Sequence, residues 1–258
     1  MKKKIFGMIL VLLIIVGCNS NQSTSSNGLI SELLTNDQII VGISPDYPPF
    51  EDLNTQGEIE GFDVDLMNEL IVFINENENL QLKVTWKSLD FDNIIGALQS
   101  EQIDIGLSGF TYDPSRDVFF SVPYIVSQQV VVVNTDSGIK SINDLSGKKI
   151  GVQTGTTGES AAQEISEAKL VSLSDAMQLF AQLQTQTVDA VVIDKAVGEN
   201  YIKSNNATIL TEPLIDENMS IIIGKKNSNL QKVIDAAISE FVKTPNYQQL
   251  LEKWSIEQ

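Results

Sequence analysis

The feature that most constrains the fold is an alternation of short β-branched runs with longer amphipathic stretches. In the first half of the chain this pattern predicts strands at residues 39–43, 82–86 and 103–107, with helices at 62–74 and 91–99 between them. Strands that alternate with helices are typical of α/β proteins with parallel strands, because a helix carries the chain back to the edge at which the next strand starts. We therefore expect an α/β architecture.

The second half of the chain repeats this order. Strands are predicted at 149–152, 170–173 and 188–193, and helices at 158–167 and 175–184. Individual residues recur as well, because the segment that ends in Asp104 resembles the segment that ends in Asp189. Both segments have a leucine and a glutamine six and five residues before the aspartate. The sequence thus predicts two lobes built to one plan.

Two extended runs connect the predicted lobes. Residues 124–133 lie between the two halves, and residues 220–223 follow the second half. Two extended crossings form a hinge that can bend while each lobe stays folded. The last segment, residues 229–254, has helical patterning, and we expect it to return to the first lobe.

The N-terminus has the composition of a secretory signal. Three lysines at residues 2–4 precede an apolar run, 5–17, that is too short to span a bilayer as a helix. The run ends in Ile-Val-Gly followed by Cys18, which resembles a bacterial lipobox, in which the cysteine carries the lipid, palmitate included. We expect a signal peptide at 1–17 and a lipid anchor with a polar tether at 18–35. The folded part would then lie on the extracytoplasmic face of the cell membrane.

Composition excludes several classes of function. Without the three lysines of the signal the chain has 34 acidic and 14 basic residues, a net charge of −20, and it has no histidine. Such an acidic chain is unsuited to nucleic acid or anionic lipid. The absence of histidine rules out histidine-based catalysis and metal sites with histidine ligands. Cys18 is the single cysteine, so no disulfide can form within the chain. We expect a monomer without metal or cofactor.

Arg116 is the only arginine in the chain, against sixteen lysines. Its planar guanidinium can hold a carboxylate with two parallel hydrogen bonds, which a lysine cannot do. Arg116 follows the predicted strand at 103–107, and we expect a helix to start there, at the kind of strand end where α/β proteins bind ligands. The alternative is a structural or surface arginine.

Two further strand ends carry groups that suit an amino acid. The turn 155–158, Gly-Thr-Thr-Gly, opens a predicted helix, and its N–H groups with the hydroxyls of Thr156 and Thr157 favour an anion. Asp194 ends the strand at 188–193 and suits an ammonium group. The alternatives are helix capping by the threonines and by Asp194. Together with Arg116, these groups describe a site for a free α-amino acid.

Two aromatic residues are candidate walls of the same site. Tyr47 lies in a proline-rich loop, residues 44–51, that the prolines keep extended. Phe91 starts a predicted helix and could form the opposite wall. The alternatives are packing within the loop for Tyr47 and the core for Phe91.

The chain resembles the family 3 extracellular solute-binding proteins, which are the polar amino-acid-binding proteins of bacterial ABC importers. The most specific segment is Gly-Phe-Asp-Val-Asp-Leu at residues 61–66, just after Tyr-Pro-Pro-Phe-Glu at 47–51. The resemblance implies a two-lobed periplasmic-binding-protein fold of type II. Each lobe would be a mixed sheet flanked by helices, and two hinge strands would join the lobes. Lobe 1 would comprise residues 36–124 and 217–258, and lobe 2 residues 125–216.

The resemblance also implies roles for individual residues. Arg116 would hold the α-carboxylate with Thr111 and the turn at Thr156 and Thr157. Asp194 would hold the α-ammonium. Ser108 and Gly109 would assist Asp194, Tyr47 and Phe91 would enclose the ligand side chain, and Asp63 and Asp65 would be structural.

Two departures from the family pattern concern the far end of the pocket. Many members have an aspartate where Ser44 stands, whereas here the aspartate is Asp46, and Gln153 stands where some relatives have lysine or leucine. With Asp90 nearby, these residues favour a basic or amide side chain, arginine ahead of glutamine. We expect the lobes to close over the ligand and deliver it to a membrane permease. A sensor or adhesin module and a dehydratase-type enzyme on the same fold are the alternatives.

Overall fold

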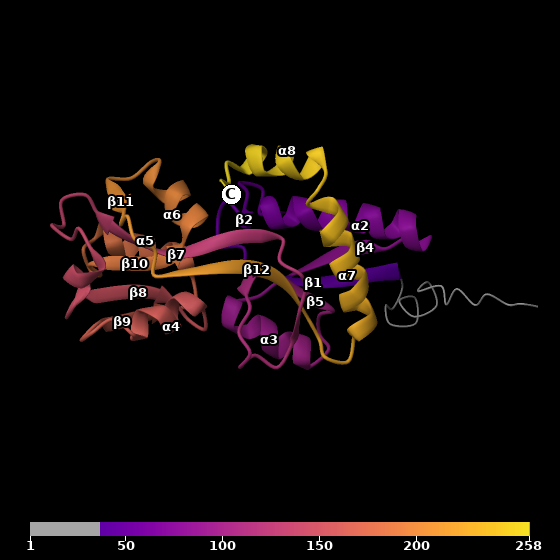
Figure 1. Cartoon of the computed structure of the whole chain (residues 1–258), viewed down its shortest axis with the longest axis horizontal. Coiled ribbons are helices and arrows are strands. Elements are labelled where there is room, and N and C mark those ends of the chain that lie inside the picture. The colour runs from indigo at the N-terminus through magenta and orange to yellow at the C-terminus, as the bar shows by residue number, and fades with distance from the viewer. Residues whose placement is uncertain (1–36, 258) are drawn as a thin grey trace, which may run out of the picture.

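A computed structural model describes residues 37–257 and has the expected two-lobed α/β fold. In Figure 1, lobe 2 with strands β8 to β10 lies on the left and lobe 1 with strands β1, β4 and β5 on the right, and β7 and β12 run between them. The predicted signal peptide, Cys18 and the tether lie outside the described residues. Within residues 37–257 the helices are too short or too polar to cross a membrane.

The strands form one long sheet and one small one. The long sheet has the order β4-β1-β5-β12-β7-β10-β8-β9, with β6 beside β12 and β11 beside β7, and β2 pairs with β3 separately. The strands are β1 (Gln38–Ile43), β2 (Asp52–Leu53), β3 (Ile59–Glu60), β4 (Lys83–Ser88), β5 (Ile105–Thr111), β6 (Phe119–Phe120), β7 (Ile125–Asn134), β8 (Lys149–Gln153), β9 (Lys169–Leu173), β10 (Ala190–Asp194), β11 (Ala207–Ile209) and β12 (Ile215–Ile223).

Helices flank the strands in both lobes. Lobe 1 has α2 (Phe62–Glu78), α3 (Phe91–Gln99), α7 (Ser228–Phe241) and α8 (Pro245–Trp254). Lobe 2 has the 3₁₀ turn η2 (Ile142–Leu145), α4 (Thr157–Gln163), α5 (Ala176–Gln184) and α6 (Lys195–Ile202).

The two lobes share one topology, as the repeated pattern in the sequence predicts. In lobe 1 the strands β4, β1 and β5 are parallel and adjacent, and in lobe 2 the strands β9, β8 and β10 are arranged in the same way. In each lobe an antiparallel strand follows: β12 pairs with β5, and β7 pairs with β10. The mixed sheet therefore becomes antiparallel where the lobes meet.

The repeated aspartates have one structural role. Asp104 accepts the N–H of Ile40 at 2.7 Å through its carboxylate, and its own N–H bonds the carbonyl of Ile40 at 2.8 Å. Asp189 makes the same pair of bonds with Lys149, both at 2.8 Å. Each aspartate thus satisfies the N–H and the carbonyl of one residue in its lobe's first strand, which the ladder leaves unpaired. This shared role explains why the two segments look alike.

The lobes are connected by a short antiparallel ladder between β7 and β12. Residues 125–129 of β7 pair with residues 215–219 of β12. We expected the second crossing at 220–223, but these residues belong to lobe 1, where Ile222 and Ile223 pair with Gly106 and Ile105. The error arose because residues 216–218 are Asp-Glu-Asn and do not look like a strand, whereas 221–223 is an apolar β-branched run.

Other expected elements also differ from the structure. Strand β5 continues to Thr111, and no helix begins near Arg116, which lies in a turn that leads to β6. Helix α4 ends at Gln163 instead of continuing to Glu167. The sequence also gave no separate prediction of α6, a short helix directly after Asp194.

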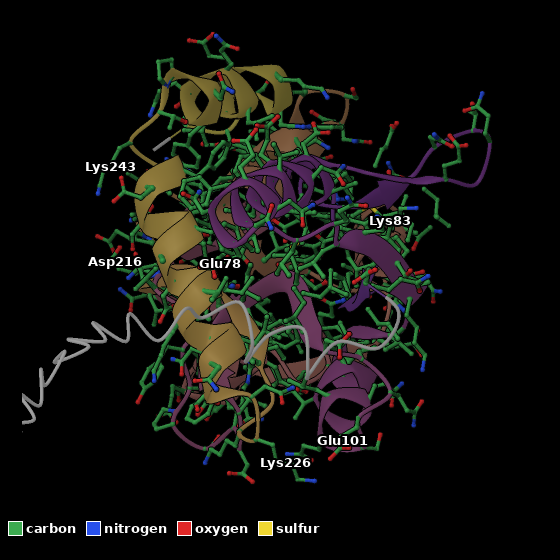
Figure 2. All side chains as sticks on the ribbon, turned by 90° about the vertical axis from the view of Figure 1, so that its right-hand side faces the viewer. Glu78, Lys83, Glu101, Asp216, Lys226 and Lys243 are labelled. Atoms are coloured by element: carbon green, nitrogen blue, oxygen red, sulfur yellow. The ribbon has the colours of Figure 1, made fainter. Side chains whose placement is uncertain are left out.

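The core of lobe 1 is built on one face of α2. Side chains at spacings of three and four residues on this helix are buried, namely Phe62, Leu66, Met67, Leu70, Ile71 and Ile74. Helices α7 and α8 return from the end of the chain and pack against α2, as expected. Figure 2 views the end of lobe 1, where Lys226, just before α7, forms an ion pair with Glu101, just after α3.

We predict that Gly61→Ala destabilises lobe 1. Gly61 precedes α2 with φ of 144°, and a Cβ there would lie 2.0 Å from the carbonyl oxygen of Phe50. The strained backbone and the clash should lower the free energy of unfolding by about 3 kcal/mol or more. Gly57→Ala is the control, because φ is 80° and no atom lies within 4 Å of its Cβ, so it should cost only about 1 kcal/mol. Denaturant unfolding measures both, and equal losses would contradict the prediction.

Candidate functional site

A pocket lies between the lobes, and eleven of the twelve predicted ligand residues line it. The exception is Ser44, which is buried beside the pocket and donates its hydroxyl to Asp46 Oδ1 at 2.7 Å. Gln129 lines the pocket although we did not predict it. The lining residues are Asp46, Tyr47, Phe91, Ser108, Gly109, Thr111, Arg116, Gln129, Gln153, Thr156, Thr157 and Asp194.

The Arg116 side chain is 8% exposed and reaches across the pocket from lobe 1. Its guanidinium donates to the carbonyl of Gly155 in lobe 2 at 2.9 Å and to that of Thr111 at 3.4 Å. Its Cζ lies 5.8 Å from the ring centre of Phe91 and 5.4 Å from that of Phe110. Burial lowers the pKa of Arg116 slightly against the pull of nearby carboxylates, but an arginine stays charged. The pocket therefore contains a fixed cation.

Asp194 is the buried carboxyl group on the opposite side. Its carboxylate accepts hydrogen bonds from Ser127 at 2.6 Å, Tyr47 at 2.7 Å and Gln129 at 3.0 Å. Although Asp194 occupies the N-cap position of α6, its side chain makes no capping bond, so the capping alternative is wrong. Burial, followed by the charge of Glu217, raises the pKa of Asp194 to about 8.

Asp46 connects lobe 1 to lobe 2 at the far end of the pocket. Its Oδ2 accepts the N–H of Ala176 at 2.7 Å, at the start of α5, and the amide of Gln153 at 3.1 Å. Burial raises the pKa of Asp46 to about 6, against the hydrogen bonds from Ala176 and Ser44. This carboxyl group therefore titrates closer to neutral pH than a free aspartate does.

The hydroxyls of the threonine turn serve other groups. Thr156 caps α4, since its Oγ1 accepts the N–H of Glu159 at 3.1 Å, which is the alternative role that we named for it. Thr157 donates its hydroxyl to Glu217 at 2.8 Å. The turn still lines the pocket, but these two hydroxyls are engaged elsewhere.

The aromatic pair has a wider role than we expected. Tyr47 donates its hydroxyl across the pocket to Asp194, so it joins the lobes as well as lining the pocket. Phe91 stacks on Phe110 with ring centres 4.5 Å apart, and both rings lie near the Arg116 guanidinium. Phe91 thus combines the core role and the wall role that we had treated as alternatives.

Comparison with known proteins identifies the family. The model of the bacterial extracellular solute-binding proteins, family 3, matches residues 39–257. The chain belongs to this family. The match covers both lobes and both crossing strands, so family membership rests on the whole described fold and not on one motif.

Relatives in this family include proteins named for amino acids. The arginine-binding extracellular protein ArtP of Bacillus subtilis is 32% identical over 93% of this chain and 92% of its own. A crystal structure of a mutant of ArgBP from T. maritima is 32% identical, with a TM-score of 0.80 over 90% of this chain and all of its own. The ancestral amino-acid-binding protein AncCDT-1, a precursor of cyclohexadienyl dehydratase, is 32% identical, with a TM-score of 0.79 over 88% and 99%.

Sequence reasoning missed two residues of the site, Gln129 and Glu217. Gln129 bridges two carboxylates, because its amide donates to Glu217 at 2.6 Å and to Asp194 at 3.0 Å. The sequence did contain a signal for Gln129, because this polar residue directly precedes a run of four valines. Glu217 was missed because we placed the second crossing at 220–223, beyond the observed ladder residues 215–219. Within residues 37–257 no group of three or more acidic, histidine or cysteine side chains could hold a metal ion.

We predict that Asp194→Asn flattens the pH dependence of stability. With a pKa of about 8 when folded and about 3.9 when unfolded, Asp194 holds a proton only in the folded state between about pH 4 and 8. As the pH rises through this range, the free energy of unfolding therefore falls by up to about 1.4 kcal/mol per pH unit. Thermal unfolding measured from pH 5 to 8 should show that the stability of the variant declines less steeply than that of the unsubstituted protein.

The control for this experiment is Asp216→Asn. Asp216 is exposed on β12. Within the described residues, its carboxylate accepts a hydrogen bond from the side chain of Gln128. This variant changes the net charge equally and should decline in parallel with the unsubstituted protein. If Asp194→Asn also declined in parallel, Asp194 would not hold the extra proton.

Proposed function

We propose that this protein captures a free polar L-amino acid between its lobes and delivers it to an ABC importer. The observation that carries the proposal is the placement of a buried cation and a buried carboxyl group in one pocket. Arg116 belongs to lobe 1 and Asp194 to lobe 2, and both line the same pocket. A free amino acid has an α-carboxylate that matches the guanidinium and an α-ammonium that can pair with the carboxyl group of Asp194.

The carboxylate end would bind at Arg116. A guanidinium has five N–H donors, and the bonds to Thr111 and Gly155 engage one on each terminal nitrogen. Donors therefore remain for a carboxylate, and Phe91 and Phe110 keep the guanidinium plane in place. The N-terminus of α4, with its Gly-Thr-Thr turn, supplies further positive potential from lobe 2.

The ammonium end would bind between Asp194 and Ser108, each of which can accept a hydrogen bond. Burying a zwitterion costs several kcal/mol per charge unless each charge is paired and hydrogen-bonded. Charge-assisted bonds of about 1.5–3 kcal/mol each offset this cost, and a net binding free energy near −8 kcal/mol corresponds to a Kd of about 1 µM. An ammonium beside Asp194 would also favour the ionised carboxylate.

The far end of the pocket favours a cationic side chain. Asp46 lines both the central pocket and an adjoining hollow whose other charged lining residues are Asp90 and Asp175. Three carboxylates and no cation suit the guanidinium of arginine or the ammonium of lysine. ArtP is named as an arginine-binding protein, and ArgBP has a structure in its arginine-bound form, which supports arginine. Glutamine is the second candidate, because Gln153 can pair with an amide.

Location and attachment complete the proposal. The family is extracellular, so we infer that the folded lobes work outside the cytoplasmic membrane. The lipobox-like segment that ends in Cys18 would anchor the protein through lipid, with residues 19–35 as the tether. We infer a monomer that presents the loaded, closed form to its permease. We propose no catalytic step. Because AncCDT-1 is a precursor of a dehydratase, a dehydratase is the alternative function. Incubation with amino acids followed by mass spectrometry tests this alternative.

A thermal-shift screen of the twenty amino acids tests the proposal, with L-arginine expected to give the largest shift. A ligand at 100 times its Kd stabilises by about 2.7 kcal/mol. Asp46→Asn should weaken L-arginine about tenfold and L-glutamine by less than about threefold, because only the cation loses its counter-charge. Asp136→Asn, in an exposed turn of lobe 2, is the control. No shift with any amino acid would refute the proposed function.

Arg116→Lys should weaken binding of the best ligand about 10- to 100-fold, which is about 1.5–3 kcal/mol. Lysine keeps the charge but loses the planar fork, so the carboxylate is held by one bond instead of two. Because Arg116 lies at the cleft, the unfolding midpoint without ligand should change little. Calorimetry measures the affinity, and an unchanged Kd would show that Arg116 does not hold the ligand.

A further inference from the structure

A chain of buried polar groups lies directly behind the pocket in lobe 1. Glu51 and Asp63 are both 0% exposed. Glu51 Oε1 accepts the hydroxyl of Ser108 at 2.6 Å, and Asp63 Oδ2 accepts the hydroxyl of Tyr124 at 2.9 Å. Ser108 lines the pocket and Tyr124 directly precedes the crossing strand β7, so two carboxyl groups connect the binding site to the hinge.

The remaining oxygens of this pair have no donor. Glu51 Oε2 and Asp63 Oδ1 are buried and lack a hydrogen-bond partner in the described structure. The two carboxyl groups nevertheless lie close enough for each to act on the pKa of the other. Two ionised carboxylates cannot bond each other, whereas a carboxylic acid can donate to a carboxylate. One proton between the two groups satisfies both orphaned oxygens.

The surroundings give no cation to take the place of this proton. The titratable groups in the described residues that act on the pair are Asp46 and Tyr124, and neither is positive. Lys253 of α8, on the far side of α2, is bound to Asp65 at 2.6 Å instead. Burial and the charge of Asp63 raise the pKa of Glu51 well above its usual range, and burial raises that of Asp63 to about 7.

We propose that Glu51 and Asp63 share one proton and act together as a positioning pair for the ligand site and the root of the hinge. The positioning part rests on the proposed amino-acid-binding function, and the shared proton does not. Neither residue touches the ligand in this proposal, because both act through Ser108, Gly109 and Tyr124.

The pair fixes the polarity of the Ser108 hydroxyl. Ser108 Oγ accepts the N–H of Ser44 at 3.1 Å and donates its single hydrogen to Glu51. A serine hydroxyl has one hydrogen and two lone pairs, so only an acceptor lone pair remains for the pocket. Ser108 can therefore bind an ammonium but cannot donate to a carboxylate. This orients the amino acid with its ammonium toward Ser108 and Asp194 and its carboxylate toward Arg116.

The other end of the pair holds the start of the hinge. Tyr124 donates its hydroxyl to Asp63, its N–H bonds the carbonyl of Met219 at 2.9 Å, and its carbonyl accepts the hydroxyl of Tyr247 at 2.6 Å. Met219 is the last β12 residue paired with β7, so both crossing strands are fixed to lobe 1 at this point. The backbone of Gly109, a pocket residue, lies close enough to lower the pKa of Asp63. The pair thus holds the pocket and the start of the hinge in a fixed position relative to each other.

The proton is tested by the pH dependence of unfolding without ligand, in Glu51→Gln and in Asp63→Asn. Above about pH 5 the unfolded chain has released both protons, whereas the folded pair keeps one. The folding equilibrium constant should therefore fall tenfold more per pH unit in the unsubstituted protein than in either amide variant. The reason is that an amide donates without titrating. Glu252→Gln, on the exposed face of α8, is the charge-matched control and should keep the original slope.

Either amide variant is sufficient, so failure of one to fold leaves the test intact. A slope in the folded amide variant equal to that of the unsubstituted protein would overturn the shared proton. Should neither amide variant fold, even though each supplies the missing donor, the shared proton would likewise be overturned.

The positioning role is tested with L-arginine as the probe at pH 6. Glu51→Leu and Ser108→Ala should each weaken binding about tenfold, and the double variant should be no more than about threefold weaker than either. Glu51→Gln should restore most of the loss because its amide oxygen accepts from Ser108. Additive losses would overturn the role through Ser108. If the unsubstituted protein bound none of the twenty amino acids, the proposed function would be refuted instead, while the slope measurement would still decide the proton.

Discussion

The antiparallel ladder between β7 and β12 is the constraint on which the rest of the structure depends. It is short, since residues 125–129 pair with 215–219, and each strand then continues into the sheet of one lobe. A pair of extended strands can twist or bend without breaking the parallel sheet on either side. The pocket lies beside this ladder, so Gln129 and Glu217 belong both to the crossing and to the network around Asp194. Binding and bending therefore involve the same few residues.

The electrostatics of the cleft follow from a scarcity of positive charge. Asp46, Glu51, Asp63 and Asp194 are largely or fully removed from solvent, and burial raises the pKa of each of them. Only Arg116 supplies a buried cation among the residues that line the pocket. The carboxylates are held by hydroxyl, amide and backbone donors, which leaves them able to respond to a ligand that carries its own positive charge. A cleft of this kind favours cationic over anionic ligands.

Several hydrogen bonds cross the cleft between the lobes. Tyr47 bonds Asp194, Asp46 bonds Ala176, and Arg116 bonds the carbonyl of Gly155. Every one of these contacts joins lobe 1 to lobe 2, and each uses a group that also lines the pocket or adjoins it. The free energy of closure and the free energy of ligand binding are therefore linked through shared hydrogen-bonding groups. Substitutions at these positions should alter both together.

The sequence by itself determined the two-lobed α/β plan and most of the pocket, because strand and helix periodicity and residue type at strand ends are local properties. The repeated aspartates and the single arginine were visible without any coordinates. Only the tertiary structure decided that Thr156 caps a helix, that Asp194 does not, and that Gln129 joins Asp194 to Glu217. Only it placed Glu51 against Asp63. Such pairings join residues far apart in the chain, and their strength depends on burial, which no local pattern specifies.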